Sequence, residues 1–122
     1  MIILILLLSR LLAFEPDFYY QEFSKKYPHK NKIVIIFTTG KAIIKMGKAD
    51  GWNLREGNAY AKGNKIYINK ERWDLLKVRC QRHIIYHELG HAVLGLDHSR
   101  NRYGSIWQYI MYPTIELNGC FK

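Results

Sequence analysis

Three histidines and a glutamate in the second half of this chain are the residues best suited to chemistry. His87 and His91 are four residues apart, so on a helix they share one face and can offer two ring nitrogens to one metal ion. Glu88 lies one position round the helix, where it can take a proton from a water molecule at that metal. The pattern predicts a metal site with a general base beside it.

A third metal ligand is expected just beyond the end of that helix. Gly95 permits the left-handed backbone that ends a helix, and His98 follows three residues later. Three neutral histidine nitrogens with an open fourth position are the donor set of a catalytic zinc site. The sequence therefore predicts one catalytic Zn²⁺ ion bound by His87, His91 and His98. The alternative is three solvated histidines that titrate near their usual pKa and bind no metal.

A long helical segment must carry the first two histidines. Residues 70–94 contain no proline, contain no glycine before Gly90, and repeat apolar side chains at helical spacing. We expect one long helix, or a short helix followed by a longer one, that finishes near Leu94. The preceding residues 58–69 alternate about a Lys-Gly-Asn-Lys centre, which predicts a β-hairpin.

The first half of the chain predicts a helix, strands and a loop. Residues 17–27 place aromatic side chains on one helix face, and the next residue is a proline. Residues 33–38 are rich in β-branched side chains and predict a buried strand. Residues 41–47 are interpreted as a second short strand or an irregular edge, and the glycine-containing residues 47–57 as a flexible loop. The fold class expected is α+β.

The opening residues 1–13 are apolar except for Ser9 and Arg10. They are shorter than the roughly 20 residues that a membrane-spanning helix needs, so we expect a signal peptide or apolar leader. Residues 14–122 then form a single domain of a secreted, periplasmic or other cell-envelope protein. The alternatives are a buried element of the mature domain or an uncleaved leader, which would be the only membrane attachment.

Composition and charge narrow the class of protein further. The 122 residues are 48% hydrophobic and carry a formal net charge of +9 spread along the chain. Such a charge favours solubility, but it forms no cluster of the kind that predicts nucleic-acid binding. Cys80 and Cys120 suit one disulfide in an oxidising compartment, although two buried thiols would give the same sequence. A disulfide would tie the tail to the start of the long helix.

The order of these motifs resembles that of the metzincin metallopeptidases, most nearly their matrixin branch. The family pattern HExxHxxGxxH, followed by a methionine in a tight turn, is similar to HELGHAVLGLDHS at residues 87–99 and SIWQYIMYP at residues 105–113. The resemblance covers roughly residues 58–115. It implies a small zincin-like domain with a twisted mixed β-sheet, a first helix, a long active-site helix and a short C-terminal Met-turn region. It also implies a peptide or protein substrate.

The resemblance assigns roles to further residues. Met111 matches the methionine of the Met-turn, although a methionine by itself is more often core filler. The substrate-binding strand of the family corresponds to Ala59, Tyr60 and Ala61. The pocket for the residue after the cut would be bounded by the active helix and residues 111–115, which include Tyr112 and Pro113. Tyr112 is also placed to stabilise an oxyanion or, more simply, to pack beside the proline. Neither the C-terminal helix of matrixins nor a cysteine-switch pro-segment is expected.

One departure from the family pattern concerns the third ligand. Gly95 and His98 lie four and seven residues after His91, whereas the family has three and six, so one residue is inserted. Without the insertion the ligand position falls on Asp97. We expect His98 to be the ligand because the spacing from glycine to histidine is kept and a bulged last helical turn can absorb one residue.

These residues predict a zinc-dependent endopeptidase with Glu88 as its general base. The alternatives are hydrolysis of another kind of amide, and a catalytically silent zinc-binding module that binds a peptide or protein partner. Glu88 favours an enzyme, because zinc binding alone does not require that acid. The other histidines, His29 and His83, are assigned no role. Core or loop anchoring is expected of the tryptophans Trp52, Trp73 and Trp107.

Overall fold

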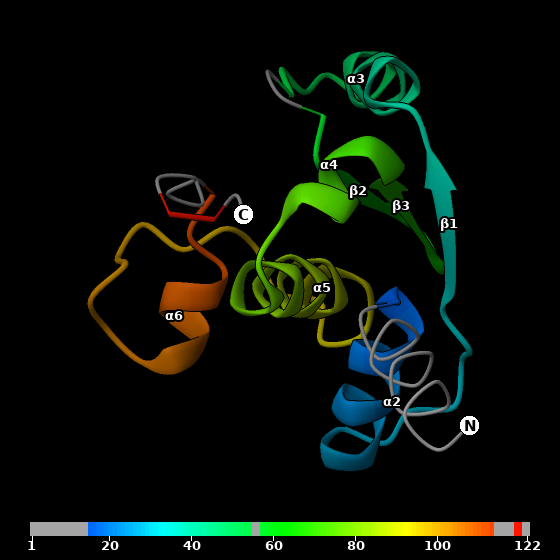
Figure 1. The fold of residues 1–122 in the computed structure, drawn as a ribbon. Helices are drawn as coiled ribbons and strands as arrows, with labels where there is room; N and C mark the ends of the chain where they lie inside the picture. The colour runs from blue at the N-terminus through cyan, green and yellow to red at the C-terminus, as the bar shows by residue number, and fades with distance from the viewer. Residues whose placement is uncertain (1–14, 55–56, 114–118, 121–122) are drawn as a thin grey trace, which may run out of the picture.

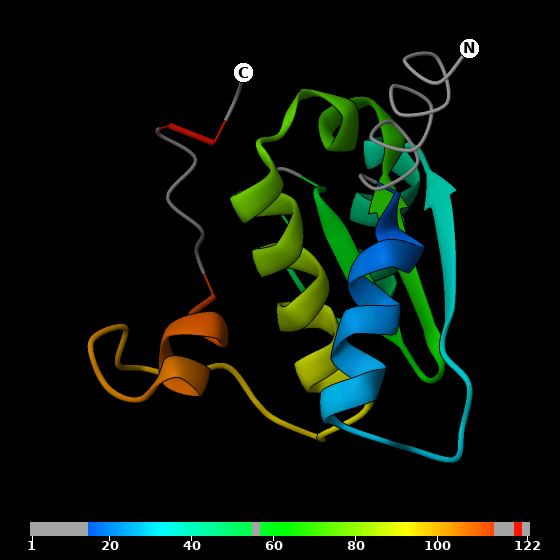
Figure 2. The same ribbon diagram turned by 60° about the horizontal axis from the view of Figure 1, so that its bottom comes forward.

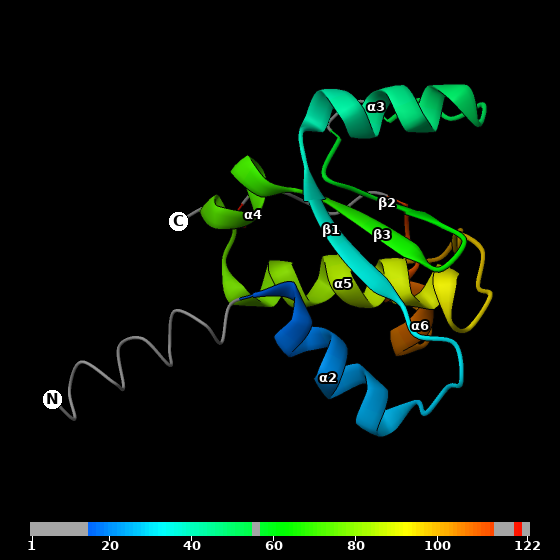
Figure 3. The same ribbon diagram turned by 90° about the vertical axis from the view of Figure 1, so that its right-hand side faces the viewer.

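The computed structural model describes residues 15–54, 57–113 and 119–120. These residues form five helices and one three-stranded mixed sheet, so the expected α+β class with a mixed sheet is confirmed (Figure 1). Helix α3 covers one face of the sheet and helices α2 and α5 lie on the other (Figure 3). No helix in the described ranges is long and apolar enough to cross a membrane. The leader of residues 1–13 lies outside the described residues.

The sheet has the strand order β1-β3-β2, with bounds Val34–Thr38 for β1, Ala59–Lys62 for β2 and Lys65–Asn69 for β3. β1 runs parallel to β3, and β2 pairs with β3 as the predicted antiparallel hairpin. Gly63 in the hairpin turn has φ of 60°, a left-handed conformation that glycine adopts without strain. β2 is therefore an edge strand with one free side.

β1 was expected to be buried, and this detail is wrong. The strand forms where the sequence predicts it, but it is the other edge of the sheet, and Val34 is exposed. An uninterrupted β-branched run suits a strand between two neighbours, yet among the described residues β3 is the one strand that pairs with it. Residues 41–47, interpreted from the sequence as a second short strand or an irregular edge, do not form a strand.

Residues 41–47 belong to helix α3 (Gly40–Ala49), which corrects the strand interpretation. The Thr39 hydroxyl accepts a hydrogen bond from the backbone N–H of Ala42 and caps the first turn. Ile43 is buried against the sheet while the lysines of the helix are exposed, which is helical periodicity. A short apolar run such as this one fits a strand or a helix equally well, so pattern alone misassigns it.

Three of the remaining helices lie where the sequence predicts them, at Pro16–Lys26 for α2, Lys70–Leu75 for α4 and Val78–Ala92 for α5. The short helix α6 (Ile106–Ile110) is not among the predicted elements, and a capping box between Ser105 and Gln108 begins it. Of the two forms proposed for residues 70–94, the short helix followed by a longer one is confirmed. The break falls at Leu76, whose backbone is extended. The long helix ends at Ala92, two residues before the predicted end.

The core lies between α2, α5 and the sheet. Figure 2 shows α2 and α5 side by side, and their fully buried side chains include Tyr19, Phe23, Ile85 and Leu89. At the start of α5, the predicted disulfide joins Cys80 to Cys120. The N-terminal half of α5 is thus fixed by the core and the tail, and its C-terminal half carries the predicted site.

Candidate metal centre

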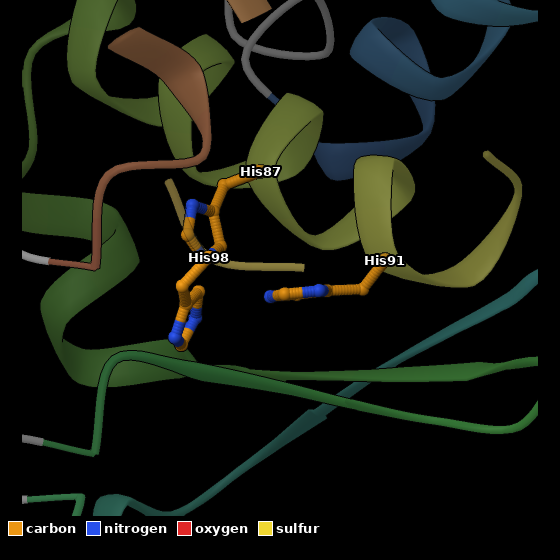
Figure 4. Close-up of side chains that lie close together, drawn as sticks. All are labelled: His87, His91 and His98. Atoms are coloured by element: carbon orange, nitrogen blue, oxygen red, sulfur yellow. The ribbon is translucent and has the colours of Figure 1, made fainter. Parts of the chain in front are cut away.

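The three predicted histidine ligands converge at the C-terminal end of α5. His87 and His91 project from the helix and His98 comes from the segment beyond it, and Figure 4 shows the three rings gathered together. One nitrogen atom from each ring lies within 4.8 Å of the other two. Such a group could hold a metal ion, because one ion can bind all three nitrogens after small ring movements.

Backbone carbonyls fix the ring nitrogen that each helical histidine offers. Nδ1 of His87 lies 2.7 Å from the carbonyl oxygen of Ile110, and Nδ1 of His91 lies 2.6 Å from that of Leu96. A carbonyl only accepts hydrogen bonds, so each Nδ1 carries the proton and each Nε2 keeps its lone pair. This arrangement orients both rings for metal binding through Nε2.

The turn after α5 is wider than a usual helix end. The backbone N–H of Leu96 donates to the carbonyl of Gly90 at 2.9 Å, and Gly95 has φ of 64°. That bond joins a residue to the sixth one after it, whereas the equivalent bond of a Schellman motif joins a residue to the fifth. After this wider turn the chain brings His98 to the other two histidines. The alternative ligand, Asp97, is not part of it.

Met111 lies under the site against α5. Its side chain is buried, and a Cβ added at Gly90 would stand 2.5 Å from its Sδ atom. Only glycine allows so close an approach at that position of the helix. The Met111 carbonyl accepts a hydrogen bond from the N–H of Ser99 at 2.9 Å, directly after the third histidine. The predicted methionine thus packs on α5 at Gly90, the residue before His91, and its backbone holds the segment that carries His98.

The electrostatics of the site favour neutral histidines. Burial lowers the pKa of His87 to about 4, with a smaller effect from the neighbouring histidines. Burial also lowers the pKa of His98, as does the nearby His91 ring. Neutral imidazole is the form that binds a metal ion, so the lowered pKa values of His87 and His98 favour metal binding by these two rings.

Glu88 is buried between α5 and the hairpin. Burial raises the pKa of its carboxyl to about 8, and the backbone amide of Ala61 opposes this by hydrogen bonding to the charged form. A carboxyl whose pKa lies near neutrality can both accept and return a proton. The predicted base is therefore beside the histidines and next to strand β2.

The free side of β2 presents backbone groups close to Glu88. The N–H of Asn69 donates to the carbonyl of Asn58, which sets the alternation of hydrogen-bonded pairs along the hairpin. Ala59 and Ala61 are the non-bonded positions, so their N–H and C=O groups point away from β3. The alanine side chains pack against the core. An extended peptide could pair with this edge.

The other predicted substrate-binding residues, Tyr60, Tyr112 and Pro113, lie in different parts of the structure. The Tyr60 hydroxyl donates to the Asp50 carboxylate at 2.7 Å, on the face of the sheet that α3 covers. Tyr112 directly follows Met111 and lies with its ring 4.8 Å from the guanidinium carbon of Arg102. Pro113 is exposed. The pocket boundary predicted at residues 111–115 lies only partly within the described residues.

Sequence reasoning missed one aromatic neighbour of the site. Trp52 was expected to be a core or loop anchor, but its side chain is exposed and its ring centroid lies 6.2 Å from that of His98. Trp73 and Trp107 do pack in or on the core, as expected. Nothing in the spacing of Trp52 indicates this contact, because the two rings come from distant parts of the chain.

The two histidines without an assigned role lie outside the metal group. His29 donates from Nδ1 to the Tyr27 carbonyl and bonds through Nε2 to the Tyr20 hydroxyl. His83 packs edge-on against the Tyr109 ring at 5.1 Å. Both side chains serve local packing.

Comparison with protein-family models, curated proteins and solved structures finds no significant match to this chain.

Proposed function

We propose that this protein is a zinc-dependent endopeptidase of the metzincin type. The observation that carries the proposal is the convergence of three histidines, two with Nε2 freed for a metal, beside a buried glutamate at a free strand edge. A structural zinc site would be closed by four protein ligands, whereas three histidines leave one position for water or substrate.

The donor set fits zinc. Three neutral imidazoles suit this ion, and His87, His91 and His98 would hold it through one nitrogen each. Bound there, zinc would lower the pKa of a water ligand toward about 7 and polarise a peptide carbonyl. The carbonyls of Ile110 and Leu96 keep two of the rings in the orientation that this requires.

Glu88 supplies the proton chemistry. Its carboxylate takes a proton from the attacking water, whose oxygen forms a bond to the carbonyl carbon of the substrate. The carboxyl then donates that proton to the nitrogen of the departing amine as the peptide bond breaks. Burial alone raises the pKa of Glu88 to about 8, and the positive charge of a metal ion bound nearby would favour the carboxylate that accepts the proton.

The edge of β2 positions the substrate. An extended peptide gains backbone hydrogen bonds to the N–H and C=O of Ala59 and to the C=O of Ala61 by adding a strand to this side of the sheet, while the Ala61 N–H stays bonded to Glu88. Ala61 lies next to Glu88, so this pairing brings a peptide bond to the site. A secreted or envelope location accords with the disulfide, which persists in oxidising compartments.

The decisive experiment measures cleavage of a mixed peptide library by the purified protein with one equivalent of zinc. We expect cleavage that a chelator abolishes and that Glu88→Gln lowers by about 10²–10⁴-fold, the usual contribution of a general base. Glu71→Gln, which changes an exposed acid on α4, is the matched control and should keep full activity.

The zinc content separates the outcomes. Glu88→Gln should still bind one zinc ion, because the acid is not among the three ligands. An unchanged rate in a zinc-loaded Glu88→Gln protein would remove the role of the base. Stoichiometric zinc without any cleavage would instead favour the silent binding module.

A further inference from the structure

Trp52 is an exposed tryptophan beside a predicted metal ligand. Its side chain is 56% exposed, and its ring meets the His98 ring edge-on. A large apolar ring left half in water next to a reactive site has surface available for a ligand. Trp73 and Trp107, by contrast, use their rings in packing.

Three hydrogen bonds hold the loop that carries Trp52. The backbone N–H of Trp52 donates to the carbonyl of Gly47 at 2.8 Å. Two residues earlier, the Asp50 carboxylate accepts hydrogen bonds from the Tyr60 hydroxyl and the Lys62 ammonium, at 2.7 Å and 3.2 Å. The indole is thus held in place relative to β2.

The Trp52 ring and the hydrogen bonds of its loop lie on opposite faces of the sheet. Asp50 binds side chains on the face that α3 covers, whereas His98 belongs to the group on the α5 side. Since β3 occupies one edge of β2, the ring reaches His98 around the uncovered side of β2. A peptide that pairs with β2 must pass that ring.

We propose that Trp52 is a specificity-determining residue that packs against an apolar side chain of the substrate close to the cleaved bond. This inference rests on the proposed function. The ring centroids of Trp52 and His98 are 6.2 Å apart. A strand rises about 3.3 Å per residue, so the selected side chain lies within about two residues of the cleaved bond.

The test compares cleavage profiles of the zinc-loaded protein, Trp52→Ala and Trp52→Phe on the same peptide library. We expect Trp52→Ala to lower kcat/KM by about 10- to 200-fold for peptides with an apolar residue at one position near the cut, the range for a hydrophobic substrate contact. Peptides without that residue should be cleaved as before. Trp52→Phe should restore most of the preference, and Phe18→Ala, an exposed aromatic of α2, should change nothing.

A second measurement places the ring without relying on catalysis. Trp107 also lies close to the histidines, because its ring packs at the Gly90 position of α5. The comparison is therefore made in a Trp107→Phe background, where Cu²⁺ added at one equivalent should quench tryptophan emission and Trp52→Phe should remove most of that quenching. Equal quenching in both proteins would contradict the position of Trp52. Cleavage with an unaltered profile in Trp52→Ala would overturn the specificity role alone. If the wild-type protein cleaves no peptide, the proposed function fails and the specificity role fails with it.

Discussion

Each histidine of the metal group depends on a backbone contact that lies elsewhere in the chain. The carbonyl of Ile110 orients His87, and the next carbonyl, that of Met111, holds Ser99 beside His98. Two successive carbonyls therefore align ligands from the helix and from the segment after it. The buried Met111 side chain therefore anchors the backbone segment whose carbonyls contact His87 and Ser99.

The identity of the third ligand is tested by two single substitutions. We expect His98→Ala to weaken zinc binding by more than the 10- to 100-fold that losing a hydrogen-bond partner of a ligand typically costs. Asp97→Ala should keep one zinc ion per chain, since Asp97 is exposed and outside the group. Competition with a metal chelator measures both affinities. Zinc loss in Asp97→Ala with retention in His98→Ala would assign the ligand to Asp97.

At the scale of elements, the hairpin and the loop after α3 form one unit. Asp50 joins them, and its hydrogen bonds from Tyr60 and then from Lys62 hold the pKa of its carboxyl below the ordinary value of 3.8. A lowered carboxyl pKa means that the contact stabilises the fold above the ordinary pKa and is lost as the pH falls through the lowered one. The loop is therefore anchored over the whole pH range in which histidines are neutral.

This anchor is measurable by NMR titration of the Asp50 carboxyl. We expect a pKa below 3.8 in the wild-type protein and a rise toward that value in Tyr60→Phe, which removes the main cause of the shift. Lys62→Met should raise the pKa by less. Tyr67→Phe changes the cross-strand neighbour of Tyr60 and serves as the control. An unshifted Asp50 in the wild-type protein would show that the loop is not fastened to β2.

The elements differ in how far the sequence predicts them. The sequence predicts α5 and the placement of His87 and His91 because residues four apart lie on the same face of a helix. Residues 41–47 are misassigned because Thr39 and the packing of Ile43, not the local pattern, decide for a helix. Trp52 is missed because its contact with His98 depends on how distant segments fold together. Local periodicity carries no information about such a contact.

At the scale of the whole molecule, α5 links two functions at its opposite ends. Near its start, Cys80 is bonded to Cys120, and the N–H of Lys77 donates to the Cys120 carbonyl at 2.6 Å. Near its end lie His87 and His91, two of the three histidines that could hold a metal ion. His87 is seven residues beyond Cys80, which on a helix is about 10 Å. Stability from the tail and chemistry at the metal should therefore be separable.

The disulfide gives the test of that separation. It closes a loop with a sequence separation of 40 residues. The chain-entropy relation gives a contribution of about 4 kcal/mol to the free energy of unfolding for such a loop. Replacing Cys80 and Cys120 together by serine should accordingly lower the midpoint of thermal unfolding by roughly 15 °C. Calorimetry of the variant and of the wild-type protein measures the difference.

The zinc affinity of the same double variant tests whether the site is independent of the tail. At a temperature well below both midpoints, it should match that of the wild-type protein, because the ligands and their carbonyl partners lie at the far end of α5. Reductant should lower the unfolding midpoint of the wild-type protein to that of the variant and leave the variant unchanged. A variant that unfolds at the wild-type temperature would show that the pair contributes no stability. Weakened zinc binding at low temperature would show that the tail reaches the site through the helix.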